Sequence, residues 1–189
     1  GYTSGTTGFP KGAVHTHQNI LSHLDGIRFH LGFDSEDVFL ASLPFFQLVA
    51  FLIHAGMAFR TGGRIVILEK FDPHMFLEAV KQEKVTFFAA VPTIYHMLYA
   101  ASEEIEVDLK TVRFGICAGS PLSPKLRDQF ETQFHFRIIH CYGLTEMALI
   151  AACEDPHIPP RGISVGQVLP YIRLRIMDEE GHPVASGEE

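Results

Sequence analysis

The first dozen residues of the chain concentrate the small polar groups that suit a polyphosphate. Residues 2–12 read YTSGTTGFPKG. Hydroxyl side chains can donate to phosphate oxygens, glycines allow positive φ so that backbone N–H groups can approach a ligand, and Lys11 adds a flexible positive charge. The hydroxyl and glycine positions are Thr3, Ser4, Gly5, Thr6, Thr7 and Gly8. The order differs from the common P-loop, because Pro10 rather than glycine precedes Lys11. The alternative hypothesis is an ordinary solvated loop, in which glycine, serine and threonine are frequent.

A second stretch with chemical potential is YGLTE, at residues 142–146. A tyrosine at the end of a strand offers a flat face on which a purine can stack. Thr145 can supply a hydroxyl group at a phosphate. Glu146 would repel a polyphosphate unless a cation lay between them, and Mg²⁺ commonly takes one carboxylate together with substrate phosphates. The alternative for the Tyr142-Gly143 pair is a simple turn that ends a strand.

Strands and helices are predicted to alternate along the chain. Short apolar runs rich in β-branched and aromatic residues predict strands, and apolar residues at three-to-four spacing predict helices. The predicted strands are residues 12–17, 37–43, 64–68, 86–91, 112–119, 137–143 and 171–178. The predicted helices are residues 18–33, an apolar helix after residue 43 that ends at the Gly62-Gly63 turn, 71–85 with Asp72 as N-cap, 92–99, and one capped by Ser123-Pro124. This alternation predicts an α/β fold with a largely parallel β-sheet flanked by helices.

The polar loops are predicted to meet at one edge of that sheet. Ligands of such folds bind at the carboxyl ends of the parallel strands. Three loops are expected there: Thr3–Gly12, Ala118–Leu122 and Tyr142–Glu146. We therefore expect these loops to converge on one site.

The histidines near the N-terminus have structural explanations. His15 and His17 share one face if their segment is extended, but no third metal ligand is evident from the sequence. His23 and His30 lie seven residues apart on the predicted helix, where a solvated or edge face is favoured. No metal site is predicted from these residues.

Composition and charge exclude several classes of protein. The 189 residues include 15 basic and 22 acidic side chains, with a formal net charge of −7 and no run of lysine or arginine, so nucleic-acid binding is not predicted. The longest apolar run, residues 43–59, is interrupted by polar residues. It is shorter than the roughly 20 residues of a membrane-spanning helix, and no integral membrane segment is expected. Cys117, Cys141 and Cys153 lack a C-x-x-C spacing and are expected to be reduced, mostly buried thiols of a cytoplasmic protein.

The motifs together resemble one family. Residues 3–12 follow the signature T-S-G-[ST]-T-G-x-P-K-G of the adenylate-forming (AMP-binding) superfamily without a mismatch, and YGLTE matches its Y-G-x-T-E motif. ICAGSPLSP, at residues 116–124, resembles the GGAPL turn that lies against the adenine of ATP. The resemblance extends over essentially the whole chain and is to the acyl- and aryl-CoA synthetases.

The resemblance implies ATP-dependent activation of a carboxylic acid, with a fatty acid favoured, to an acyl-adenylate, followed by thioester formation with CoA. The implied cofactors are ATP and Mg²⁺, with CoA as co-substrate. Catalytic roles are implied for Lys11, Thr145 and Glu146, and Glu146 is the implied magnesium ligand. The implied nucleotide-binding residues are Thr3, Ser4, Gly5, Thr6, Thr7, Gly8, Lys11, Ala118, Gly119, Ser120, Pro121, His140, Tyr142, Gly143 and Thr145. Two alternatives stay open: an adenylation enzyme that loads a carrier protein, and a non-catalytic nucleotide-binding or interaction module.

The chain departs from the family pattern near the acyl pocket and at its ends. Gln47 stands where the family commonly has histidine, Ala50 replaces a frequent glycine, and His140-Cys141 replaces a frequent Gln-Gly. These changes leave the acyl specificity open. The resemblance implies that residues 1–189 are the central part of the AMP-binding domain, truncated at both ends and without the small C-terminal lid domain. We therefore predict little or no adenylation by this fragment alone, and its oligomeric state is left open because cut surfaces could let it self-associate.

Overall fold

The main sheet has seven strands in the order β4-β3-β5-β6-β7-β8-β9. It is seen in a computed structural model that describes residues 1–3, 8–104, 108–185 and 187. The strands are β3 (Val38–Ala41), β4 (Arg64–Ile67), β5 (Phe87–Ala90), β6 (Phe114–Cys117), β7 (Arg137–Tyr142), β8 (Ala152–Cys153) and β9 (Gln167–Val168). The five neighbouring strands β4, β3, β5, β6 and β7 pair in parallel, whereas β8 is antiparallel to both β7 and β9. The predicted α/β fold with a largely parallel sheet is confirmed.

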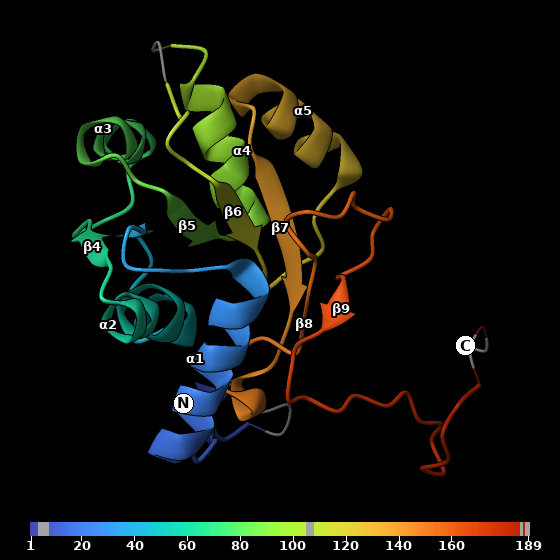
Figure 1. Cartoon of the computed structure of the whole chain (residues 1–189). Coiled ribbons are helices and arrows are strands. Elements are labelled where there is room, and N and C mark those ends of the chain that lie inside the picture. The colour runs from blue at the N-terminus through green and yellow to red at the C-terminus, as the bar shows by residue number, and fades with distance from the viewer. Residues whose placement is uncertain (4–7, 105–107, 186, 188–189) are drawn as a thin grey trace.

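Helices cover both faces of the sheet (Figure 1). Helices α3, α4 and α5 pack on one face, and helix α1, the π-helix η1 and α2 pack on the other. The bounds are α1 (His17–Leu31), η1 (Val49–Gly56), α2 (Met57–Thr61), α3 (Pro73–Glu83), α4 (Pro92–Ala101), α5 (Pro124–Phe134) and the short 3₁₀ helix η2 (Thr145–Met147).

The central strands are apolar throughout because both of their faces are covered. Along β5, Phe88 and Ala90 belong to the core beneath α3 to α5, whereas Phe87 and Ala89 belong to the core beneath α1 and η1. Successive side chains of a strand point to opposite faces, so a strand between two helical layers reads as a continuous apolar run. The sequence FFAA in β5 and FGIC in β6 are fully buried examples.

Polar caps set where the helices begin. Asp72 accepts a hydrogen bond from the backbone N–H of Met75 at 2.9 Å, and Pro73 occupies the first turn of α3, as predicted. Ser123 caps α5 in the same way, with its hydroxyl 3.5 Å from the backbone nitrogen of Leu126. Each capped helix starts shortly after a parallel strand ends, which leaves the strand ends open at one edge of the sheet.

Two predicted strands are wrong. The first was residues 12–17: the chain forms only the short strand β2 (Lys11–Gly12), and helix α1 then starts at His17 because Thr16 and Asn19 form a reciprocal capping box. The second was residues 171–178, where the described chain forms only an isolated bridge between Met177 and Pro183. That segment has an alternating pattern, but among the described residues only 182–184 pair with it, through two backbone hydrogen bonds of 2.9 and 3.1 Å, which is too short a ladder for a strand.

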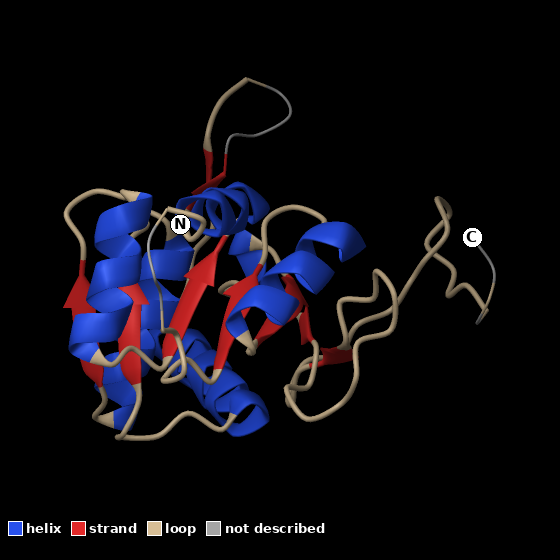
Figure 2. Cartoon of the chain, turned by 90° about the horizontal axis from the view of Figure 1, so that it is seen from above, coloured by secondary structure: helices blue, strands red, loops and turns tan. Residues whose placement is uncertain are grey.

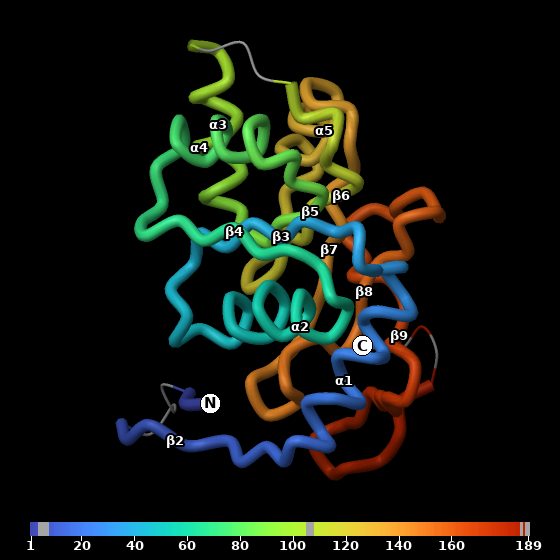
Figure 3. Tube along the Cα trace, turned by 60° about the vertical axis from the view of Figure 1, so that its left-hand side comes forward, coloured from blue at the N-terminus to red at the C-terminus, as the bar shows by residue number. Residues whose placement is uncertain are grey.

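The N-terminal residues form a hairpin in which β1 (Tyr2–Thr3) pairs antiparallel with β2. Figure 2 shows this hairpin projecting from the helices and the sheet, and Figure 3 follows the trace from the hairpin into α1. Within the described parts of the chain, no helix combines the length and the apolar character needed to cross a membrane.

Candidate functional site

A cavity of about 230 Å³ opens at the carboxyl ends of the parallel strands. Its walls come from the ends of β5, β6 and β7, from the segment that follows β3, and from the π-helix η1. Most of the lining is aliphatic, and the polar side chains at its boundary include Gln47, Tyr142 and Thr145. An apolar hollow with a few polar groups at one side is the usual form of a small-molecule site.

Two of the three predicted loops meet at this cavity. Ala118 and Gly119 follow β6 and line it together with Tyr142, Gly143 and Thr145. Gly119 has φ +84°, a left-handed conformation that glycine adopts without strain and that turns the chain away from the strand end.

Other predicted residues of these loops do not line the cavity. Ser120 and Pro121 are exposed. The side chain of His140 is buried, and its backbone N–H donates to the Glu154 carboxylate at 2.8 Å. Burial, with a smaller contribution from the Arg127 charge, lowers the pKa of His140 below its usual range. His140 is therefore a buried, neutral side chain near neutral pH and is not part of the cavity lining.

The YGLTE segment folds into a tight turn after β7. A Cβ atom on Gly143 would lie 1.4 Å from the backbone oxygen of Leu149, so only glycine lets the two backbone segments pass each other. The turn divides two of the three predicted catalytic residues, Thr145 and Glu146, between two hollows. Thr145 lines the 230 Å³ cavity, whereas Glu146 lines a more open hollow of about 400 Å³ beside the start of α1.

The beginning of the chain lies against this turn. A Cβ atom on Gly1 would be 2.9 Å from the Thr145 methyl carbon, and the His15 Nε2 atom lies 2.8 Å from the Thr145 backbone oxygen. Thr3 is half-buried in β1, while Gly8 and Lys11 are exposed and line neither hollow. The remaining predicted phosphate-loop residues, Ser4, Gly5, Thr6 and Thr7, lie outside the described residues.

Two histidines hold the segment that follows β7 at Thr145 and at Ile150, a role that the sequence did not reveal. The His15 Nε2 atom hydrogen-bonds the Thr145 backbone oxygen, and His23 Nε2 accepts the backbone N–H of Ile150 at 3.1 Å. Burial, with a smaller effect of His15, lowers the pKa of His23 to about 4, which keeps its ring neutral and able to accept. The predicted solvated or edge face is therefore wrong for His23, because its ring is buried and accepts the N–H of Ile150, which follows two residues of positive φ.

Comparison with known proteins identifies the family. The model of the family described as "AMP-binding enzyme" matches residues 1–189. The chain belongs to the AMP-binding enzyme family. It is 30% identical over 189 residues to a feruloyl-CoA synthase of Amycolatopsis sp, covering all of this chain and 38% of that protein. It is 31% identical to 4-coumarate–CoA ligase 1 of Arabidopsis thaliana, covering 95% of this chain and 34% of that protein.

Solved structures of adenylate-forming enzymes share the fold of this AMP-binding chain. ATP-bound MatB from Rhodopseudomonas palustris superposes with a TM-score of 0.90 at 26% identity, over 99% of this chain and 37% of that one. The predicted resemblance to adenylate-forming CoA ligases is confirmed. The chain spans a little over a third of the length of these relatives.

The site of this AMP-binding chain has suitable donors for Mg²⁺. Glu146 is exposed in its hollow, and the amide side chains of Gln18 and Asn19 line the same hollow. Oxygen donors with one carboxylate suit Mg²⁺, which completes its shell with water and phosphate oxygens. Among the described residues, no group of three or more His, Cys, Asp or Glu side chains could hold a metal ion alone. A magnesium ion held by Glu146 would thus take its other ligands from the two amides, water or phosphate oxygens.

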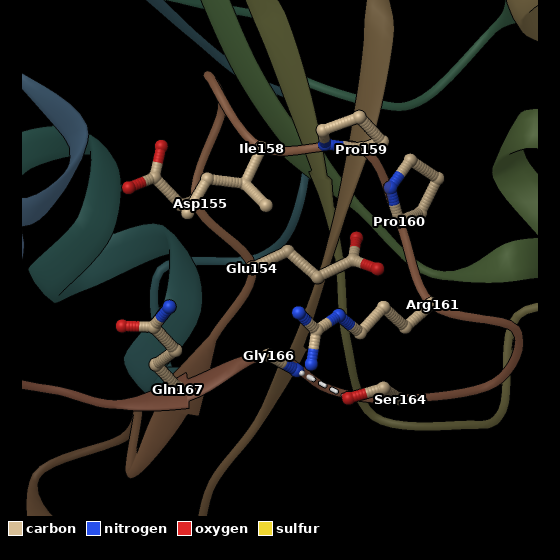
Figure 4. Close-up of a pocket in the computed structure, with 9 residues that line it drawn as sticks. All are labelled: Glu154, Asp155, Ile158, Pro159, Pro160, Arg161, Ser164, Gly166 and Gln167. Atoms are coloured by element: carbon tan, nitrogen blue, oxygen red, sulfur yellow. Dashed lines mark hydrogen bonds between the residues drawn. The ribbon is translucent and has the colours of Figure 1, made fainter.

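A buried ion pair supports the wall behind the site, and sequence reasoning missed it. Arg127 of α5 contacts Glu154 through two hydrogen bonds of 3.1 and 2.8 Å, and both side chains are buried. Glu154 also borders a separate hollow of about 150 Å³, shown in Figure 4, where the backbone N–H of Gly166 donates to the Ser164 hydroxyl. None of the predicted site residues that the structure describes lines this hollow. An arginine and a glutamate 27 positions apart carry no periodic signal that would pair them.

Proposed function

We propose that residues 1–189 are the central part of the AMP-binding domain of an acid–thiol ligase, which activates a carboxylic acid with ATP and transfers the acyl group to CoA. The observation that carries this proposal is the apolar cavity at the strand ends, with Tyr142 and Thr145 at its boundary. A carboxylic acid with an apolar body would fill the cavity and present its carboxylate toward Thr145. The names of the relatives as CoA ligases favour CoA over a carrier protein as acceptor.

The nucleotide would lie along the outer side of the Tyr142–Thr145 turn. Tyr142 is 46% exposed, which leaves a ring face free for stacking on adenine. Thr145 would contact the α-phosphate, and Glu146 would hold Mg²⁺ from the neighbouring hollow. Lys11 and the hydroxyl groups of residues 3–7 would bind the remaining phosphates, which requires the projecting hairpin to approach the turn. Positioning and charge neutralisation are the main demands of this reaction on the protein.

The volume of the cavity limits the size of the carboxylic acid that the site can hold. Its volume of about 230 Å³ is below the roughly 300–1,000 Å³ of pockets for drug-sized ligands. The described walls therefore fit a compact apolar body, such as a short acyl chain or one aromatic ring. A long fatty acid would need room beyond these walls. The relatives named for feruloyl and coumaroyl groups make hydroxycinnamic acids the first aromatic candidates.

The test is acid-dependent exchange of pyrophosphate into ATP by the full-length protein, with short-chain, long-chain and hydroxycinnamic acids as substrates. Glu146→Gln should reduce exchange at least about 100-fold, because the amide loses the charge that holds the metal. Glu36→Gln is the matched control, since Glu36 is exposed in the loop before β3, at the opposite edge of the sheet. Exchange that no acid stimulates, or that Glu146→Gln leaves intact, would contradict the proposal. Mass spectrometry of the acyl product with CoA and with a carrier protein identifies the acceptor.

A further inference from the structure

Two cysteines face each other across the antiparallel pair β7–β8. Cys141 lies directly opposite Cys153, and their sulfur atoms are 2.6 Å apart. The backbone N–H of Glu154 donates to the His140 oxygen at 3.1 Å, so His140 and Glu154 form a hydrogen-bonded pair of the ladder. The neighbouring pair, Cys141 and Cys153, is therefore a non-hydrogen-bonded pair. Such non-hydrogen-bonded pairs have Cα atoms about 4.5 Å apart. This separation falls inside the range of about 4.4–6.8 Å found in disulfides.

The surroundings of the pair distinguish the two thiols. Cys141 lines the 230 Å³ cavity, so the cysteine pair lies at the wall of a hollow that is large enough for a small peroxide. His30 lies on the other side, with its Nε2 atom 3.3 Å from the Glu154 backbone oxygen. Burial opposes ionisation of Cys153, but hydrogen bonds with Cys141 and His30 bring the pKa of its thiol below the usual value. Burial raises the pKa of Cys141 well above its usual range.

We propose that Cys141 and Cys153 are an oxidation site that closes to an intramolecular disulfide, with hydrogen peroxide or another small hydroperoxide as the oxidant. The peroxide oxidises the Cys153 thiol to a sulfenic acid and releases water. The Cys141 sulfur then attacks the Cys153 sulfur, an S–S bond forms, the S–O bond breaks, and a second water leaves with the remaining thiol proton. Two thiols are oxidised and one peroxide is reduced to two waters.

The consequence concerns the turn between the two cysteines. They are 12 positions apart, and the Tyr142–Glu146 segment lies between them. A disulfide would link β7 to β8 covalently on either side of this segment, where the reduced protein has only hydrogen bonds between the two strands. The inference does not depend on the proposed ligase activity, because it rests on the β7–β8 pairing and the thiols alone.

The third cysteine of the chain provides an internal reference. Cys117 lies on β6 and is buried, and burial raises the pKa of its thiol to about 12. A thiol with so little thiolate at neutral pH reacts slowly with peroxide. Cys117 should therefore stay reduced under conditions that oxidise the pair.

The experiment treats the native full-length protein with hydrogen peroxide, alkylates free thiols after denaturation, and maps the three cysteines by non-reducing peptide mass spectrometry. We expect a Cys141–Cys153 cross-linked peptide, 2 Da lighter than the sum of its parts and released by dithiothreitol, with Cys117 alkylated. Cys117→Ser should form the same cross-link to the same extent. Cys141→Ala and Cys153→Ala should each lose it, and folding of each variant is checked by circular dichroism.

Three results would overturn the inference. The first is full alkylation of both cysteines after peroxide treatment of the folded protein. The second is oxidation of either cysteine of the pair to a sulfinic acid without cross-linking. The third is a cross-link that includes Cys117 or a second molecule. Because Cys117→Ser keeps both sulfurs of the pair, it keeps the test decisive even if the variants of the pair do not fold.

Discussion

His54 makes the stability of this protein sensitive to acid, and its replacement tests why. The His54 side chain is fully buried in η1, and its Nε2 atom accepts the backbone N–H of Ala89 at 3.1 Å. The pairing of β3 with β5 ends at Leu40 and Phe88, so the imidazole supplies the acceptor at the point where the β3 ladder ends. Ala89 lines the cavity, which links this hydrogen bond to the candidate site.

The magnitude follows from the pKa of His54. Burial, opposed by a smaller contribution from the backbone of Val49, lowers that pKa from 6.5 to about 4. The unfolded chain takes up a proton below pH 6.5, whereas the native protein does so only near pH 4. The contribution of His54 to the free energy of unfolding is therefore fully present above pH 6.5 and is lost as the pH falls toward 4. Each pKa unit corresponds to about 1.4 kcal/mol, so His54 accounts for a loss of about 2 kcal/mol at pH 5 and about 3 kcal/mol at pH 4.

His54→Leu removes the titrating group and leaves the Ala89 N–H without its acceptor. At pH 7.5 the variant should be less stable by about 1–3 kcal/mol, the cost of a buried unsatisfied donor. As the pH falls, the wild-type protein loses the His54 contribution and the variant does not, so the difference should shrink, vanish between about pH 6 and pH 4, and change sign below that point. The assay is urea unfolding followed by circular dichroism at several pH values.

The matched control is His96→Leu on the exposed face of α4, which should change the free energy of unfolding by less than about 0.5 kcal/mol. His23 contributes a similar acid-dependent loss to wild type and to both variants, so it cancels in the comparison. A constant difference between wild type and His54→Leu from pH 7.5 to pH 4 would refute the reasoning. It would mean that His54 titrates alike in the folded and unfolded states.

Two further substitutions test the turn and the wall behind it. Gly143→Ala should destabilise the protein by about 3 kcal/mol or more, because its Cβ collides with the Leu149 backbone; Gly12→Ala, whose Cβ would meet only the Tyr2 ring at 3.4 Å, is the control in the same thermal unfolding assay. A Gly143→Ala protein with unchanged melting temperature would show that the turn is not held as described. Arg127→Met should cost about 3–5 kcal/mol by leaving the Glu154 carboxylate buried and unpaired. Adding Glu154→Gln, which can still accept the His140 N–H, should recover at least about half of that loss in urea unfolding, and no recovery would argue against an uncompensated charge as the cause.

The order of the strands and helices could be predicted because it depends on local patterns. The apolar runs of β5 and β6 and the caps at Asp72 and Ser123 are set by residues within a few positions of one another. The strand predicted at residues 171–178 is wrong because strand formation depends on residues far from the segment itself. A strand needs a partner, and alternation within one segment says nothing about whether a neighbour is present.

The sequence by itself determined the family, the α/β class and the two polar motifs, because each is written in contiguous residues. Only the tertiary structure decided which groups meet. It placed Thr145 and Glu146 in different hollows, set His15 and His23 at the two ends of their turn, and paired Arg127 with Glu154. These contacts join residues from 27 to 130 positions apart. Such contacts arise when separate elements pack to bury apolar surface, and a polar group buried in that process takes whatever partner the packing brings within reach.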